Sequence, residues 1–463
     1  MVGLVSPDDS GRVLGSVQSI DVDDLPVPRV QIELSTAEER LTSAAGWGDA
    51  SRVMALVRLH THPMGVVFLD GRLGPLLQRH ADGIWALLHQ RINAHLAADG
   101  LPRAHGLADL VSLPTMDLPS CLRRRQDVLA RPPLISVVVA TRDRPDSLRA
   151  CLDSLLKVNY QRFEIVVVDN NPSTADTAKL IASEFDSVHY VREDRPGLAA
   201  AHNCGLQAVQ GQIVAFVDDD VLIDDQWLAA IAEGFAETDD VGCVTGLIMP
   251  EQLETPAQLL VEHRGGYGKG FDLQIFDTER NRPADPLFPF AAGRLGSGAN
   301  MAFDTAMLRS LGGFDRALGV GTFARGGDDL SGFFRMIVAG HRLVYQPSAI
   351  VWHRHHRDMA ALRNMAYGCG VGMGAFLTSS VAHEPKVVAD LLRRLPAGIA
   401  HAFKRSAIPD PDRPHQWPGE LVRAERRGLL AGPLAYATSR WRIRRVAAVV
   451  GRHEHALADR THR

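Results

Sequence analysis

The chain contains few cysteines, and they lack the spacing that cysteine-based folds require. Its 463 residues include 5 cysteines, and no two of them form a Cys-x-x-Cys pair. A scattered, odd-numbered set argues against a disulfide framework and against zinc sites built from cysteine pairs, and it is typical of a reducing compartment. We therefore expect a cytoplasmic protein without structural zinc.

The chain also lacks a large excess of charge and a long hydrophobic run. Fifty Lys and Arg residues against 54 Asp and Glu residues give a net charge of −4. A nucleic-acid binder needs a basic face, so no nucleic-acid partner is expected. Residues 1–9 do not have the basic-then-apolar order of a signal peptide. Residues 364–382 are uncharged but contain four glycines, which favours a close-packed or surface-lying helix over a membrane-spanning one.

The length of the chain, and the changes in composition and hydrophobic pattern along it, predict several domains. Residues 1–24 are expected to be a flexible leader, and residues 25–130 a small α+β domain of unknown role. Residues 133–357 are expected to form the catalytic domain, and residues 358–463 a C-terminal helical region. The boundary after residue 130 is marked by Arg131-Pro-Pro133.

The small N-terminal domain offers little evident chemistry. Apolar runs at residues 53–60 and 65–69 predict a β-hairpin, and residues 75–98 have the apolar spacing of a helix. His60 and His62 could bind a metal, but two histidines beside a turn are more often structural. We therefore expect no functional site in this domain.

The next segment alternates between apolar runs and helical patterns. Runs at residues 134–140, 163–169, 188–191 and 213–217 predict strands with helices between them. This alternation implies parallel pairing and an open, doubly wound α/β sheet. Polar residues follow three of these strands, at 141–143, 169–171 and 218–220. Because parallel strand ends meet at one edge of a sheet, these residues are expected to line one crevice.

The most informative of these strand ends carries three adjacent carboxylates, Asp218, Asp219 and Asp220. Side chains two apart on an extended chain point the same way, so Asp218 and Asp220 can share a cation while Asp219 faces elsewhere. Three adjacent carboxylates need a counter-charge, and a hard divalent ion that also holds a phosphate is the usual one. A solvated acidic turn is the alternative for these residues alone.

The order of motifs from Pro133 to His356 resembles that of the bacterial family-2 glycosyltransferases, which have the GT-A fold. The resemblance covers about half of the chain and includes Ile135–Pro145, Glu164–Asn170, Arg195–Asn203, Phe216–Asp220, Gly296–Phe303, Gly312–Asp315, Gly326–Leu330 and Val351–His353. It implies a Rossmann-like nucleotide-sugar domain and an inverting, hexosyltransferase-type enzyme. The donor would be a UDP-sugar, and the acceptor a hydroxyl group of a glycan, a lipid-linked sugar or a small molecule. Glycan, glycolipid and natural-product biosynthesis are the processes implied.

The resemblance also assigns residues to the nucleotide pocket. It implies that Thr141 and Asp143 line the base pocket and that Asp169 accepts a hydrogen bond from the uracil ring. Asp218 and Asp219 would lie near the ribose and the phosphates.

Other positions are assigned to the sugar, the diphosphate and the metal. Asn300 would flank the donor sugar, and His202 stands near the diphosphate where many family members have arginine. A neutral imidazole supplies less fixed charge there, so the metal matters more. Asp220 would hold Mn²⁺ or Mg²⁺, and His353 would approach the metal or the diphosphate.

The catalytic base is expected in the pair Asp328 and Asp329, where many family members have Glu-Asp. A carboxylate aimed at the acceptor hydroxyl can remove its proton as the new bond forms. Asp329 is the expected base, although the shorter first side chain leaves the choice between the two open. Both could instead stabilise the N-terminus of a helix that begins near Leu330.

Two other functions and several partners stay open. A nucleotidyltransferase would be expected to carry a glycine- and lysine-rich loop after the first strand, unlike Thr141–Pro145. A catalytically silent sugar-nucleotide-binding scaffold would have no need of a base. Residues 428–450 predict a basic amphipathic helix that could lie on the inner face of the cell membrane, on the catalytic domain or on a second subunit of a homo-oligomer.

Overall fold

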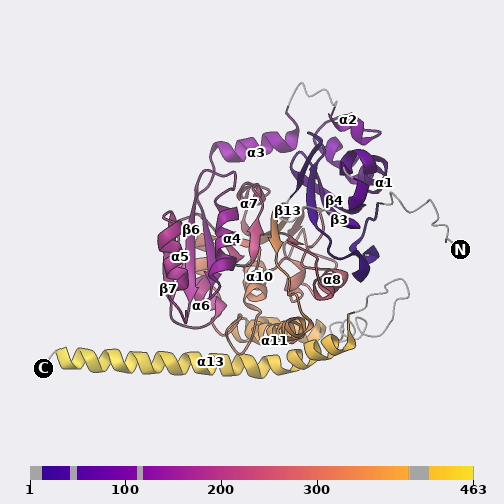
Figure 1. Ribbon diagram of the computed structural model, residues 1–463. Coiled ribbons are helices and arrows are strands. Elements are labelled where there is room, and N and C mark those ends of the chain that lie inside the picture. The colour runs from indigo at the N-terminus through magenta and orange to yellow at the C-terminus, as the bar shows by residue number, and fades with distance from the viewer. Residues whose placement is uncertain are drawn as a thin grey trace.

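The computed structural model describes residues 13–41, 50–73, 75–111, 118–394, 396 and 417–461. Two sheets, each covered by helices, occupy most of the molecule, and two long C-terminal helices lie along one side (Figure 1). Among the helices described, none is at once long enough and apolar enough to traverse a bilayer.

The N-terminal sheet has four strands in the order β2-β1-β3-β4. Their bounds are β1 Arg29–Glu33, β2 Glu38–Leu41, β3 Arg52–Leu59 and β4 His62–Asp70. The expected hairpin is present as β3 and β4, and the expected helix as α1, Leu76–Ala98. Short elements follow or precede these: η1 Val17–Ser19, η2 Val22–Asp24, η3 Gly71–Leu73, α2 Leu107–Val111 and α3 Ser120–Ala130.

Both faces of this small sheet are covered. Apolar side chains from one face pack under α1, and those from the other, including Met54 and Phe68, pack against Met249 and Trp352 of the larger sheet. The described part of the expected leader, residues 13–24, joins this second cluster through buried Ile20. Leu14 also pairs with Phe68, so the segment contacts the small sheet at these two points.

The larger sheet has nine strands in the order β11-β13-β10-β12-β8-β5-β6-β7, with β9 paired to β13. The bounds are β5 Ile135–Thr141, β6 Phe163–Asn170, β7 Val188–Glu193, β8 Ile213–Asp218, β9 Val221–Ile223, β10 Val241–Pro250, β11 Gln274–Phe276, β12 Met301–Asp304 and β13 Arg342–His353. Strands β5, β6, β7, β8, β10 and β13 share one direction, and the other three run against them. The predicted α/β class with a mostly parallel sheet is confirmed.

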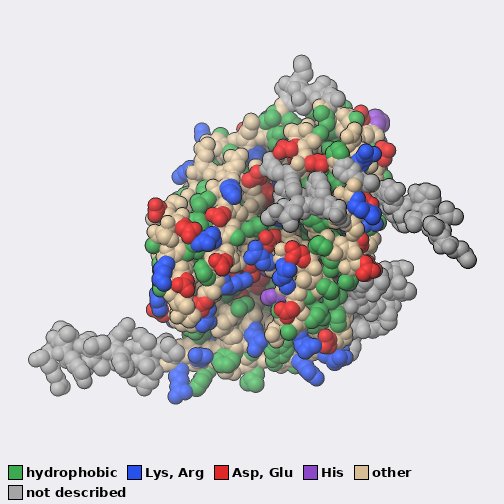
Figure 2. Space-filling view, viewed as in Figure 1, with side chains coloured by type: hydrophobic (Ala, Val, Ile, Leu, Met, Phe, Trp, Pro, Cys, Tyr) green, Lys and Arg blue, Asp and Glu red, His purple; other side chains and the backbone are tan. Residues whose placement is uncertain are grey.

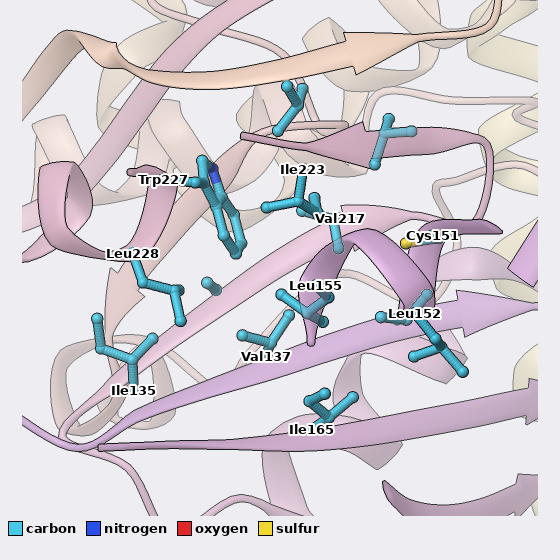
Figure 3. Close-up of a cluster of buried hydrophobic side chains, with 14 of the residues drawn as sticks. Ile135, Val137, Cys151, Leu152, Leu155, Ile165, Val217, Ile223, Trp227 and Leu228 are labelled. Carbon is cyan, nitrogen blue, oxygen red and sulfur yellow. The ribbon is translucent and has the colours of Figure 1, made fainter. Parts of the chain in front are cut away.

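Helices cover both faces of this sheet. They are α4 Pro145–Leu155, α5 Asp176–Glu184, α6 Leu198–Ala208, α7 Trp227–Phe235, α8 Pro256–His263, η4 Ala292–Arg294, α9 Thr305–Ser310 and α10 Asp328–Val338. Alternate residues of the central strands β5, β6, β8 and β12 enter separate cores, one beneath α4, α5 and α7 and one beneath α6 and α10. Figure 3 shows the first core, where Val137 and Ile165 lie near Leu152 and Leu155 of α4. The period-two alternation of buried strands produces the doubly wound arrangement.

The C-terminal region consists of α11 Met359–His383, η5 Pro385–Val387 and α13 Gly419–Thr461. Helices α11 and α13 lie side by side (Figure 1), and glycines allow their backbones to touch. A Cβ at Gly370 would lie 2.0 Å from the Glu425 carbonyl oxygen, and one at Gly428 would lie 2.2 Å from the Tyr367 oxygen. The uncharged, glycine-rich segment is thus a close-packed helix. Residues 397–416 lie outside the described part of this region.

A buried ion pair joins α3 to α7, which covers the larger sheet, and its loss should destabilise the protein. Arg125 Nε and Nη2 donate to the two oxygens of Glu233 on α7 at 2.9 and 2.8 Å, and both residues are buried. Arg125→Met leaves a buried carboxylate unpaired, which should lower the free energy of unfolding by about 3–5 kcal/mol. Denaturant titration of the full chain measures this loss.

The exposed neighbour Arg124 provides the control. Its ion pair with Glu237 is at the surface, so Arg124→Met should change the free energy of unfolding by at most about 1 kcal/mol. Equal stabilities of the Arg125→Met and Arg124→Met variants would contradict the role given to the buried pair.

Candidate active site

The polar residues that follow β5 and β8 form one connected network. The two strands pair so that Ala140 lies opposite Asp218. Thr141 Oγ1 donates to Asp219 Oδ2 at 2.6 Å, and Arg144 donates to Asp219 Oδ1 at 2.7 Å and to Asp220 Oδ2 at 2.9 Å. Thr141 and Arg144 therefore hold the acidic turn, and Arg144 supplies a cation that sequence reasoning did not single out.

Asp218, Asp220 and His353 form a candidate metal site. Each offers one ligand atom, and these atoms lie within 4.8 Å of one another. His353 reaches the acids because β13 pairs with β9, which places it opposite Val221. Its Nε2 is 3.6 Å from Asp220 Oδ1. The two acids are two residues apart and converge, as expected, while Asp219 turns toward Thr141.

The chemistry of this cluster fits a divalent cation. Asp220 Oδ1 is buried without a hydrogen-bond partner among the described residues. Burial, followed by the charges of Asp220 and Asp219, raises the pKa of Asp218 well above its usual value. Burial also lowers the pKa of His353 to about 4, which leaves its imidazole neutral at physiological pH. Arg144 balances only part of the negative charge of these carboxylates, and the neutral imidazole adds no positive charge. A bound cation would supply the remainder.

A second layer of side chains orients His353. Its Nδ1 lies 2.9 Å from Nδ1 of His355, and His355 Nε2 lies 2.8 Å from Glu262 Oε1 on α8. Histidine ligands commonly use their second nitrogen in this way, which fixes the ring and its tautomer. The sequence showed the His353–His356 block, but it did not indicate that α8 would supply the carboxylate.

The neighbouring strand end contains a buried carboxylate with a free acceptor. Tyr190 of β7 donates its hydroxyl to Asp169 Oδ2 at 2.9 Å, whereas Asp169 Oδ1 is buried with no partner among the described residues. Burial raises the pKa of Asp169. Asp143, on the facing loop, instead accepts a hydrogen bond from the Ser173 amide at 2.9 Å. Asp143 therefore supports the loop after β6, and Asp169 offers the open acceptor.

Asp328 and Asp329 lie in the first turn of α10, directly after Gly327, whose φ is 86°. Asp329 accepts hydrogen bonds from the amides of Gly298 at 3.0 Å and Leu330 at 2.8 Å. It is half-buried, whereas Asp328 is buried. Burial and the adjacent Asp328 raise the pKa of Asp329 to about 6. Asp329 is thus fixed by backbone amides and more accessible than its neighbour.

The structure gives His202 a position different from the expected one. Its ring is 2% exposed and lies between Phe216 and Phe314, with ring centroids 4.8 and 5.1 Å away. Its Nδ1 is 3.5 Å from Asp328 Oδ2. The residue therefore lies beside Asp328 within the core rather than lining a diphosphate pocket, because α6 turns this face toward the sheet.

The expectation for Asn300 is also corrected. The side chain is 1% exposed. Its oxygen accepts from Trp227 Nε1 at 2.9 Å, and its nitrogen donates to the carbonyls of Leu247 and Ala349 at 3.1 and 2.8 Å. All of these partners are internal, so Asn300 links β10, β12 and β13 and does not present its amide to a sugar.

One face of the molecule has a region of mixed charge. Figure 2 shows basic and acidic side chains gathered around the lower centre of the visible face. Arg144 of the acidic network is half exposed, with 51% of its side-chain surface accessible. A site with cationic side chains, crowded carboxylates and a neutral imidazole suits a phosphate ligand together with a divalent ion.

Comparison with known families identifies the central segment. Residues 136–299 match the family model described as glycosyl transferase family 2. A pre-mycofactocin glycosyltransferase of Mycobacterium tuberculosis is 26% identical over 258 residues, which are 54% of this chain and 48% of that protein. An uncharacterized protein, y4gI, of Sinorhizobium fredii is 37% identical over 118 residues, 24% of this chain and 13% of that protein. The chain spans at most about half the length of these two relatives.

Among solved structures, a mannosyltransferase from Pyrobaculum calidifontis in complex with GDP-Man and Mn²⁺ is similar over 73% of this chain and 86% of its own. The sequence identity is 21% and the TM-score is 0.39.

Proposed function

The central segment of this chain, residues 136–299, is a family-2 glycosyltransferase segment, and from this premise we propose that the protein is a metal-dependent, inverting glycosyltransferase. It moves a sugar from a nucleotide-diphosphate donor to a hydroxyl acceptor in bacterial glycan, glycolipid or natural-product biosynthesis. The observation that carries the proposal is the convergence of Asp218, Asp220 and His353 at the strand edge that also holds Asp169.

The donor pocket follows from the unpaired groups at this edge. The buried Oδ1 of Asp169 needs a donor, and the ring N–H of uracil supplies one, which supports UDP as the nucleotide. Arg144, already oriented by Asp219 and Asp220, lies where it can contact a phosphate. Asp218, Asp220 and His353 would hold Mn²⁺ or Mg²⁺, which when bound stabilises the negative charge on the departing diphosphate.

Asp329 is proposed to act as the general base. The acceptor hydroxyl transfers its proton to the Asp329 carboxylate while its oxygen bonds to the anomeric carbon of the donor. The bond from that carbon to the diphosphate oxygen breaks, and the nucleoside diphosphate leaves. Attack from the side opposite the leaving group inverts the configuration. The amides of Gly298 and Leu330 hold the carboxylate in place through this step.

A thermal-shift screen of nucleotide sugars, with and without Mn²⁺, tests donor binding. We expect UDP-sugars to raise the melting temperature of the full chain, and Mn²⁺ to increase that shift because the ion and the diphosphate share a site. GDP-, dTDP- and CMP-sugars are the comparison ligands. Stabilisation by no nucleotide sugar would contradict the proposal. Binding without hydrolysis or transfer to any acceptor would favour the silent sugar-nucleotide-binding alternative.

The outer face of α13 supports a membrane-associated acceptor. Leu430, Leu434 and Trp441 share one side of the helix, and they are 82, 74 and 58% exposed. Basic residues flank this apolar stripe, and Arg445 lies over the Trp441 ring, 5.1 Å from its centroid. Such a helix can bind the interface of an anionic bilayer. We propose peripheral contact with the cytoplasmic face of the cell membrane, where a lipid-linked acceptor would be available.

Liposome flotation tests this contact. The full chain should float with anionic phosphatidylglycerol vesicles, and Leu434→Glu should reduce the floating fraction because it places a charge in the apolar stripe. Vesicles of phosphatidylcholine alone are the control for electrostatic attraction. Equal flotation of the two proteins would reject the membrane role. A molecular mass in solution that increases with protein concentration would instead indicate that this face joins the subunits of a homo-oligomer.

A further inference from the structure

A second cluster of potential metal ligands lies in the N-terminal domain, outside the catalytic sheet. It consists of His60, His95, Asp99 and Cys121, whose ligand atoms lie within 4.8 Å of one another. His60 is in the turn between β3 and β4, His95 and Asp99 are at the end of α1, and Cys121 is in the first turn of α3. Three separate segments therefore direct side chains to one point.

The separations in this cluster resemble those of a tetrahedral zinc site. Bonds of about 2.0–2.2 Å to nitrogen and oxygen and about 2.3 Å to sulfur imply ligand separations of about 3.3 Å, or about 3.6 Å where sulfur is one partner. His60 Nδ1 lies 3.3 Å from His95 Nε2 and 3.1 Å from Asp99 Oδ2. His95 Nε2 lies 3.3 Å from the same oxygen. Cys121 Sγ lies 3.8 and 3.7 Å from the two imidazole nitrogens.

The remaining separation is shorter than that geometry requires. Cys121 Sγ lies 2.9 Å from Asp99 Oδ2, as a thiol that donates to the carboxylate. Loss of the thiol proton on metal binding would remove this hydrogen bond, and the two negative ligands would then separate around the cation. Five of the six separations thus match a metal site already, and the sixth has a specific cause.

Each ligand is held in place by its own segment. His60 has a φ of 53°, and its amide donates to Glu33 Oε1 at 3.0 Å, which fixes the turn. Positions 95 and 99 are one helical turn apart and therefore share a face of α1. The second oxygen of Asp99 accepts from the Cys121 amide at 2.8 Å. A cluster prearranged in this way binds a metal with little loss of conformational freedom.

We propose that His60, His95, Asp99 and Cys121 bind one Zn²⁺ ion. Imidazole and thiolate ligands select zinc over the Mn²⁺ or Mg²⁺ of a carboxylate-rich site. Four protein ligands fill a tetrahedral ion, so this is a structural site without an open position for catalysis. The thiol proton is released to solvent on binding, and the ion is bound by a thiolate, a carboxylate and two neutral imidazoles.

The site would fix the N-terminal domain against the catalytic domain. The bound ion would join the hairpin turn to α1 and to the start of α3. Helix α3 then contacts α7 of the larger domain through the buried pair of Arg125 and Glu233. This arrangement gives the N-terminal domain a role in positioning α3, which leads directly to β5.

Cobalt substitution of the full-length protein tests the ligand set. Co²⁺ added to chelator-treated protein should produce the visible bands of a tetrahedral ion and a thiolate-to-cobalt charge-transfer band in the near ultraviolet. Equimolar Zn²⁺ should remove both. Absence of the charge-transfer band in folded wild-type protein would overturn the proposal, whatever the behaviour of the variants.

Zinc content of variants locates the site. Protein purified without chelator should contain one zinc per chain, and Cys121→Ala and His95→Ala should lose it. Cys369→Ala, at an exposed cysteine, and His89→Ala, elsewhere on α1, should keep it. Asp220→Asn should also keep it, which separates this ion from the catalytic one. Loss of zinc from Asp220→Asn, or its full retention by a folded Cys121→Ala variant, would overturn the assignment.

Discussion

Asp220→Asn is expected to abolish Mn²⁺-stimulated transfer while leaving the fold intact. The change removes the negative charge of the residue whose Oδ1 has no hydrogen-bond partner in the described part of the chain and lies 3.6 Å from His353 Nε2. A metal ion at a departing phosphate contributes several kcal/mol, so the loss in kcat should be about a thousand-fold. The measurement is donor hydrolysis and transfer over a Mn²⁺ titration.

The matched control is Asp153→Asn, which removes an exposed carboxylate from α4. This variant should keep the wild-type rate and the wild-type dependence on Mn²⁺. The melting temperature of both variants checks that the fold is retained. Wild-type stimulation of Asp220→Asn by Mn²⁺ would contradict the assignment of this residue to the metal.

Asp329→Asn should still bind the donor but turn over about 10²–10⁴-fold more slowly. An amide occupies nearly the same volume as the carboxylate, and its single oxygen can still accept from one of the Gly298 and Leu330 amides, which bond to different oxygens of Asp329. The amide cannot take a proton from the acceptor. General-base catalysis contributes a factor of this size. Single-turnover rates, together with donor affinity by calorimetry, measure the two properties separately.

The neighbouring carboxylate provides the comparison for this assignment. Asp328 is buried next to His202, so Asp328→Asn should affect stability as well as rate. If Asp329→Asn turns over normally and a folded Asp328→Asn variant is inactive, the role of base passes to Asp328.

The pH dependence of the wild-type rate provides independent evidence for the same base. Burial and the charge of Asp328 raise the pKa of Asp329 to about 6. A protonated carboxyl group cannot accept the hydroxyl proton, so kcat should fall as the pH decreases through about 6 and should be constant above it. A rate that stays constant down to pH values near the ordinary aspartate pKa, about 4, would contradict this assignment.

The main sheet and its polar edge were predictable from the sequence because both depend on local pattern and chain direction. Apolar runs that end in acids placed Asp169 and Asp218 at one edge of the sheet, where they lie at the ends of β6 and β8 on either side of β5. The two-residue period also predicted that Asp218 and Asp220 would converge while Asp219 turned away. The family prediction rested on motif order and is confirmed for residues 136–299.

The misplaced residues depend on tertiary packing that no local pattern encodes. His202 and Asn300 lie in glycine- and alanine-rich motifs near the site, but the side that each presents is set by contacts with Phe314 and Trp227. The positions of Arg144 and Tyr190 likewise follow from the approach of separate strands and loops. The roles of Arg144 and Asp169 in donor binding, and of Asp329 as the base, stay predictions.

The proposed zinc site could not be predicted from local sequence patterns either, because its ligands are far apart along the chain. His60, His95 and Cys121 are separated by 35 and 26 residues along the chain, so no short motif connects them. Reasoning from cysteine pairs predicted no structural zinc, because a site with a single cysteine has no such signature. Only the folding of the hairpin against α1 and α3 brings the four ligands together.

A crystal structure with Mn²⁺ and UDP, using anomalous scattering to locate manganese, tests the central claim most directly. We expect one manganese peak in contact with Asp220 and His353, a diphosphate bound to that ion, and a uracil ring at Asp169. A manganese peak remote from Asp220 and His353, or UDP bound away from this edge of the sheet, would contradict it.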